Sequence, residues 1–155
     1  MARDIRQAPS DLALLANLLK RAGRGDLRRQ LLAAIRKEGG PSVKAAQEAA
    51  QEALPQRGGF ADLVAKNISV RSSLSGSSAS VRIRRKGKIP TDRTMTGIDE
   101  SGTWRHPVFT RAVWVEQSAP GAVGWFTKSI DATAPAYRSA ILQAMEDVAA
   151  KLLRV

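Results

Sequence analysis

The chain has 155 residues, 43% apolar and 5% aromatic, a composition that predicts one domain with an aliphatic core. It contains no cysteine, so the sequence excludes disulfides, thiolate metal sites and cysteine nucleophiles. The formal net charge is +11, and no run approaches the roughly 18 apolar residues that a membrane helix needs.

The positive charge is unevenly distributed along the chain. Residues 1–40 hold nine basic and four acidic side chains, residues 41–90 nine and three, and residues 91–155 seven and seven. This surplus indicates either a polyanionic neighbour, nucleic acid or an acidic protein, or a solvated surface without a charged ligand. Charge alone leaves both interpretations open. The polar start of the chain predicts no signal peptide, so we expect a soluble, unexported protein.

The first 38 residues predict two helices. Ser10 or Asp11 is the expected N-cap of the first helix, and Asp26 is the expected cap of the second. The leucine stripe of the first helix comprises Leu12, Leu15, Leu18 and Leu19. The apolar stripe of the second comprises Leu27, Leu31 and Ile35.

A break at residues 39–42 precedes a third predicted helix, Val43 to Leu54, which has a weak apolar face and ends before Pro55. We therefore expect a helical segment of residues 1–42 followed by a core of residues 43–155. The helical segment either packs on the core or reaches a neighbouring subunit.

The periodicity then changes to two, which predicts a β-hairpin with a turn at residues 75–78. One face of the hairpin is expected to be apolar and the other polar, with Arg82 and Arg84 outward. The expected inward residues are Ile68, Val70, Ser72, Leu74, Ala79, Val81 and Ile83.

Residues 87–106 have no clean period, so we expect a long loop there. A further strand is predicted at residues 112–116; if Val113 and Val115 face the helices, Trp114 faces outward. A last helix is predicted at residues 132–153, with Pro135 in its first turn. Its core-facing stripe comprises Tyr137, Ile141, Met145, Val148 and Leu152.

Together these elements predict an α+β fold in one domain, residues 1–155. Its small antiparallel sheet, the hairpin plus the further strand, is expected to pack against the N-terminal helices and the long C-terminal helix.

The sequence offers few groups for catalysis. His106 is the only histidine, and a lone loop histidine is more often structural than catalytic. Asp99 and Ser101 lie nearby in sequence, but a triad is defined by geometry rather than by adjacency. No cluster of metal-binding side chains and no phosphate-binding glycine loop occurs. We therefore expect no catalytic, cofactor-binding or metal-binding residues, and a protein that is not an enzyme.

A basic patch follows the second hairpin strand and comprises Arg82, Arg84, Arg85, Lys86 and Lys88. Two interpretations fit this patch. The side chains contact phosphates with salt-dependent affinity, or they form a solvated strand edge whose charges discourage aggregation.

The aromatic side chains of the last third of the chain, with the arginines beside them, have the composition of a protein–protein hot spot. The interface candidates are Trp104, Arg105, His106, Phe109, Arg111, Trp114, Trp125 and Phe126. The alternative is that these rings fill the core; for Trp114 both interpretations stay open, and for Trp125 we expect burial.

Three short segments carry a family resemblance: Arg-His-Pro-Val-Phe at 105–109, Val-Trp-Val-Glu-Gln at 113–117 and Gly-Trp-Phe at 124–126. With the Leu-Pro-Gln-Arg-Gly-Gly-Phe-Ala-Asp-Leu segment at 54–63 and the closing amphipathic helix, they resemble small minor-tail or neck proteins of siphophages, especially those that infect actinobacteria. The resemblance covers about residues 43–153, and the first 40 residues carry no family motif.

The resemblance implies a structural virion protein that forms a homo-oligomeric ring, a hexamer, around the DNA channel where head meets tail. Its implied partners are copies of itself, the adjacent neck and tail ring proteins and, without sequence specificity, the packaged DNA. The implied location is the virion, after assembly in the host cytoplasm. Tail completion protein, tail terminator and head–tail connector all fit. The alternative function is a stand-alone basic nucleic-acid-binding module.

Overall fold

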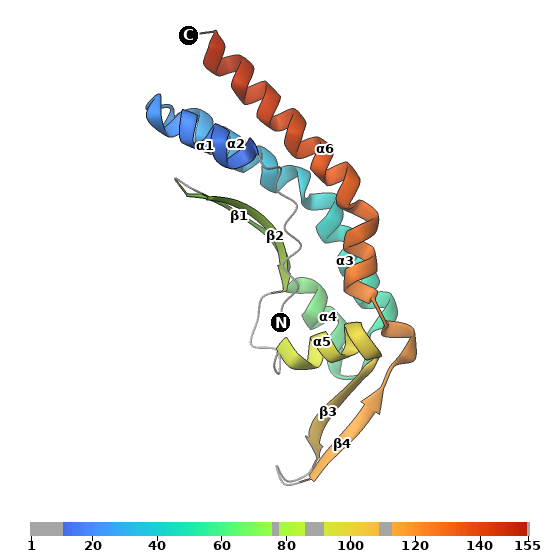
Figure 1. Ribbon diagram of the computed structural model, residues 1–155. Coiled ribbons are helices and arrows are strands. Elements are labelled where there is room, and N and C mark those ends of the chain that lie inside the picture. The colour runs from blue at the N-terminus through green and yellow to red at the C-terminus, as the bar shows by residue number, and fades with distance from the viewer. Residues whose placement is uncertain (1–10, 76–77, 86–91, 109–112, 155) are drawn as a thin grey trace. The chain divides into compact units, whose positions relative to one another are not determined.

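The computed structural model describes residues 11–75, 78–85, 92–108 and 113–154 (Figure 1). Its architecture is α+β, as the sequence predicted: the described residues form six α-helices and two separate two-stranded sheets. The chain divides into two compact units. Unit 1 is built from Lys44–Ile68 and Arg85–Ala132, and unit 2 from Asp4–Val43, Ser69–Arg84 and Thr133–Val155.

The predicted boundary after residue 42 lies within one residue of a boundary between the units. However, the β-hairpin and most of the last helix belong to unit 2, together with the N-terminal helices.

Unit 2 begins with the two predicted helices, α1 (Asp11–Arg21) and α2 (Gly25–Glu38). All three apolar residues of the α2 stripe are buried, as are Leu12, Leu15 and Leu19 in α1. The prediction for Leu18 was wrong, because its side chain is 47% exposed. Successive helical residues rotate by about 100°, so Leu18 lies about that far around α1 from Leu19.

The predicted cap of α2 was also wrong. Arg24 occupies the N-cap position without a side-chain cap, and Asp26 lies inside the first turn. The Asp26 carboxylate accepts hydrogen bonds from the Arg24 guanidinium, at 3.1 Å from Nε and 3.0 Å from Nη2. These bonds lower the pKa of Asp26 to about 2. The ion pair favours the charged carboxylate near the helix N-terminus, where the helix dipole also favours it.

The predicted hairpin is present as β1 (Ile68–Ser75) and β2 (Ser78–Arg85). Leu74, Val81 and Ile83 are buried, as expected, and Arg84 is exposed. Two arginines of α2 attach that helix to β1: Arg28 donates to the Leu74 carbonyl, and Arg36 Nε donates to Ser72 Oγ at 3.1 Å.

Tyr137 joins the last helix to α2 inside unit 2. Its hydroxyl donates to the Ile35 carbonyl at 2.8 Å, and its side chain is buried. Gly39 caps α2 directly beside this ring, and its N–H donates to the same carbonyl. The close approach of Tyr137 and Val70 therefore leaves no room for a side chain at position 39.

The last helix, α6, runs from Trp125 to Leu153 and begins earlier than residue 132. Four members of its predicted core stripe are buried: Tyr137, Ile141, Met145 and Val148. Pro135 lies inside the helix rather than in its first turn, which corrects the prediction. Proline lacks the N–H that would pair with the carbonyl four residues earlier, and the helix tolerates this gap where Asp131, Ala132 and Pro135 are solvent-exposed.

Unit 1 contains most of α3 (Gly40–Ala53), the short turn η1 (Arg57–Gly59) and α4 (Phe60–Lys66). Ala46 and Ala50 of α3 are fully buried, and Leu54 follows at the same spacing. The sequence between α3 and α4 turns sharply because Gly58 and Gly59 both adopt positive φ.

The predicted loop at residues 87–106 was wrong. It contains α5 (Asp92–Ser101) and most of β3 (Thr103–Val108). Met95 and Ile98, three residues apart on one face of α5, are both buried. This single apolar pair holds a helix whose other residues are mostly polar, so the sequence shows no sustained period.

The predicted further strand is β4 (Val113–Ser118), but it does not join the first hairpin. It pairs with β3 to form a second, separate antiparallel hairpin. The short helical turn η2 (Pro120–Ala122) then leads into α6.

Asp99 of α5 caps the start of α6. Its Oδ1 accepts from the backbone N–H of Phe126 at 2.8 Å and of Thr127 at 3.3 Å, and its Oδ2 accepts from Thr127 Oγ1 at 2.5 Å. The Asp99 carbonyl also accepts from the Gly124 N–H at 2.6 Å. Because the first N–H groups of a helix have no partner within it, this carboxylate explains why α6 begins at Trp125.

We expect Asp99→Ala to lower the free energy of unfolding by about 1–2 kcal/mol, since it removes the acceptor for these helix N–H groups. Denaturant titration of the full chain measures this change. Glu100→Ala is the matched control, because Glu100 is exposed and adjacent. Equal stability of the two variants would contradict the capping role.

Gly39→Ala should destabilise the chain by about 1–3 kcal/mol through overpacking. A Cβ at this position would lie 2.5 Å from Val70 Cγ2 and 2.9 Å from Tyr137 Oη. Thermal and chemical unfolding test this prediction. Gly40→Ala serves as the control, because a Cβ at Gly40 meets nothing within 4 Å; a similar loss in both variants would oppose the packing argument.

The Tyr137 phenol should lose its proton at a higher pH than an exposed tyrosine does. Burial, and secondly the negative charge of Glu38, raise its pKa from 10.0 to about 12. The stability linked to this neutral phenol is therefore present below about pH 10 and is lost as pH rises to about 12. Tyr137 is the only tyrosine, so phenolate absorbance reports it alone. A midpoint equal to that of the denatured chain would refute its burial.

Candidate protein interaction surface

The β3–β4 hairpin extends away from α5 within unit 1 (Figure 1). Its register pairs Thr103 with Ser118 at the base, Arg105 with Glu116 midway and Pro107 with Trp114 towards the tip. All six residues of β4 are solvent-exposed. Neither face of this strand is therefore buried by the residues that the structure describes.

Exposed apolar side chains occupy three consecutive positions of β4. Val113 and Trp114 are each 54% exposed, and Val115 is 39% exposed. Because side chains alternate along a strand, Trp114 and Glu116 lie on one face, and Val113, Val115 and Gln117 lie on the other. Trp114, for which the sequence left exposure and burial open, is therefore exposed, and the two valines on the other face are exposed as well.

The base of the hairpin is fixed by a short series of hydrogen bonds. The Gly102 N–H donates to the Ile98 carbonyl at 3.0 Å, and the Ala119 N–H donates to the Gly102 carbonyl at 2.6 Å. Gly102 has a positive φ, and a Cβ there would lie 2.9 Å from the Ala119 carbonyl oxygen. The chain therefore enters β3 and leaves β4 at one closed point beside α5.

The structure separates the predicted interface residues into two groups. Trp104 is half-buried, and Arg105 and Trp114 are exposed on the hairpin. Trp125 and Phe126 are buried, with ring centroids 5.4 Å apart, so they belong to the core of unit 1. The burial of Trp125 was predicted from the sequence, whereas Phe126 was expected at the interface.

The other predicted interface residues lie outside the part of the chain described. Phe109 and Arg111 belong to the residues between β3 and β4 that the structure does not describe. The Cα of His106 lies opposite that of Val115 in the hairpin register, but its side chain is not described.

A groove at the base of the hairpin was not predicted from the sequence. It has a volume of about 540 Å³. Its lining residues are Pro55, Arg57, Phe60, Trp104, Gln117 and Ser118. Its aromatic and proline walls come from the α3–α4 turn, the first residue of α4 and β3, which are far apart in sequence, so no local pattern indicates the groove.

The turn that forms one wall of this groove is held by Gln56. Its side-chain amide donates to the backbone carbonyls of Gln51 and Leu54. These contacts tie the turn to the end of α3, and Arg57 follows directly. The groove wall is therefore a structured part of unit 1.

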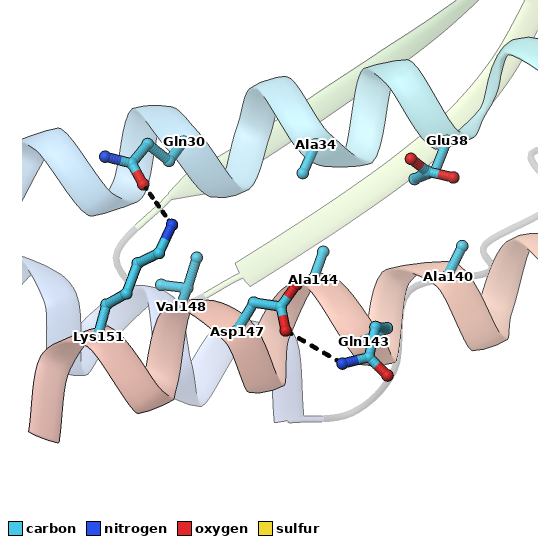
Figure 2. A pocket seen from close by; sticks show the side chains of 9 residues that line it. All are labelled: Gln30, Ala34, Glu38, Ala140, Gln143, Ala144, Asp147, Val148 and Lys151. Carbon is cyan, nitrogen blue, oxygen red and sulfur yellow. Dashed lines mark hydrogen bonds between the residues drawn. The ribbon is translucent and has the colours of Figure 1, made fainter.

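Unit 2 carries a second concave surface between α2 and α6, with a volume of about 340 Å³. Figure 2 shows Ala34 and Ala144 facing each other across this gap. Lys151 Nζ donates to Gln30 Oε1 at 3.1 Å, and Gln143 Nε2 donates to Asp147 Oδ1 at 3.1 Å. These polar side chains at the rim of the concave surface bond to one another. Few polar groups are therefore left to bind a ligand.

The basic patch lies mostly outside the described side chains. Arg84 is exposed and Arg82 is half-buried on the polar face of β2, while the side chains of Arg85, Lys86 and Lys88 are not described. Arg71, on β1, is also exposed. Unit 2 contains 14 basic and six acidic side chains, so it holds most of the positive surplus.

Among the described residues, no group of three or more His, Asp or Glu side chains comes together as a metal site. Ser101 Oγ donates to the Gly97 carbonyl at 2.9 Å and lies 2.9 Å from Thr103 Oγ1. Within the same described ranges, no helix is long and apolar enough to span a membrane.

Comparisons with protein families, with curated proteins and with solved structures give no match to this chain.

Proposed function

We propose that the protein is a structural subunit of a tailed bacteriophage that assembles into a ring at the head–tail junction or at the head-proximal end of the tail. One observation carries the assembly role: the run Val113-Trp114-Val115 is exposed on the β3–β4 hairpin, and every residue of β4 is exposed.

The energetics of the hairpin favour a partner. An isolated two-stranded hairpin is at best marginally stable in water, and each large apolar side chain left in solvent forgoes about 1.5–3 kcal/mol of burial. A neighbouring subunit that covers β4 supplies both the missing burial and further contacts. The hydrogen bonds at its base hold the β3–β4 hairpin, hereafter the arm, in a fixed position beside α5.

The virion role rests on the family resemblance. Its most specific segments, residues 105–109 and 113–117, fall on the β3–β4 hairpin or between its strands, and residues 124–126 open α6. They thus belong to the same unit as the exposed strand. A ring subunit requires adhesive surfaces rather than catalytic groups, which agrees with the character of this hairpin.

The alternative, a stand-alone nucleic-acid-binding module, draws on the basic surplus of unit 2 and on exposed Arg71 and Arg84. Steeply salt-dependent DNA binding by a monomer would favour it. Binding of the ring alone, or no binding, would favour the assembly role.

Trp114→Ala should weaken self-association at least about 30-fold and leave the unfolding transition unchanged, because truncating an interface tryptophan typically costs about 2 kcal/mol or more. Sedimentation of the full chain over a concentration series measures this. Leu63→Ala is the control, since Leu63 is an exposed apolar side chain of α4. Unchanged association of the Trp114 variant would sink the assembly role of the hairpin.

A further inference from the structure

We infer that the groove at the base of the hairpin, lined by Phe60 and Trp104, receives the Trp114 side chain of a second copy of this chain. This inference rests on the proposed function, because it identifies the two surfaces that meet when the subunits associate. Both surfaces belong to unit 1: a protruding aromatic side chain and an aromatic-walled groove of about 540 Å³.

The groove cannot be filled by the hairpin of its own chain. Trp114 lies four residues before Ser118, roughly 13 Å along the strand from the hairpin base. Gln117 and Ser118, on opposite faces of β4, both line the groove at the base of the hairpin, whereas Trp114 lies nearer the tip. At this separation along the strand the exposed indole does not fill its own groove and is available to a neighbour.

Charge complementarity supports the pairing. Glu116 lies on the same face of β4 as Trp114, two residues away, and is exposed. Arg57 lines the groove and is exposed as well. Arg105 lies opposite Glu116 in the hairpin register and is exposed too, so this face carries one charge of each sign. When Trp114 of one copy enters the groove of the next, the Glu116 carboxylate is the group on this face that can pair with the Arg57 guanidinium, and such pairs can form bidentate hydrogen bonds.

The resulting contact joins two different surfaces of the same chain. Such a heterologous contact repeats from copy to copy and closes into a ring when the rotation allows. An isologous dimer would instead use one surface twice. The arm and the groove of unit 1 thus supply the two unlike surfaces that a ring subunit requires.

Charge reversal tests this contact in the full-length chain. Glu116→Arg alone places like charges together, and so does Arg57→Glu alone, so each should weaken self-association at least about tenfold. An equimolar mixture of the two variants should recover association, because every arm then meets a groove of opposite charge. The double variant should recover it as well. Mass measurement across a concentration series provides the readout.

Matched controls carry the same charge changes elsewhere on unit 1. Glu100→Arg and Lys66→Glu alter exposed side chains of α5 and α4 and should leave association unchanged. Unfolding transitions of all variants verify that each remains folded; a variant that unfolds is replaced by the milder Glu116→Gln or Arg57→Gln, for which a smaller loss is expected.

The outcomes separate this inference from the proposed function. If Trp114→Ala abolishes association but the charge-reversed variants associate normally, or do not rescue each other, the hairpin is the interface and the groove is not its receptor. If Trp114→Ala associates like the unmodified chain, the assembly role and this inference both fail.

Discussion

The position of the β3–β4 hairpin in unit 1 depends on the hydrogen bonds by which Asp99 joins α5 to the start of α6. The Asp99 carboxylate caps α6, and the Asp99 backbone carbonyl accepts a hydrogen bond from the Gly124 N–H. Between these two tied points the chain leaves α5, forms the whole β3–β4 hairpin and returns. The cap therefore closes the base of the hairpin as well as starting the helix.

The hydrogen-bonded base of the hairpin lowers the entropy cost of binding a partner. A hairpin on a loose tether would lose conformational entropy when it docks, and this cost reduces affinity. Here Gly102 links α5 to β3 and accepts the Ala119 N–H, so the two strands leave a common, hydrogen-bonded point. The exposed Val-Trp-Val run is consequently presented by a preorganised element, which suits an assembly contact.

Sequence periodicity predicted the elements whose stability comes from a regular apolar face. The stripes of α1, α2 and α6 and the alternating residues of β1 and β2 are of this kind. Periodicity failed to predict the elements in which few side chains are buried: in α5 the buried apolar side chains are Met95 and Ile98, and all six residues of β4 are exposed. The start of α6 could not be predicted locally, because its cap lies 27 residues earlier in the chain.

The candidate interaction surface also combines residues that the sequence singled out with a feature that no local pattern indicates. The sequence singled out Trp114 as an interface candidate but left its exposure open. It gave no sign of the groove, because the groove walls at Phe60 and Trp104 meet only in the folded unit. Phe126 was misplaced, since its neighbourhood in sequence resembles that of an interface residue although it packs against Trp125.

Electron microscopy of the purified chain at high concentration shows whether the subunits associate through the hairpin. We expect closed rings in which the β3–β4 hairpin of each subunit lies against the next. Dispersed single subunits, or an assembly in which Trp114 faces solvent, would contradict it.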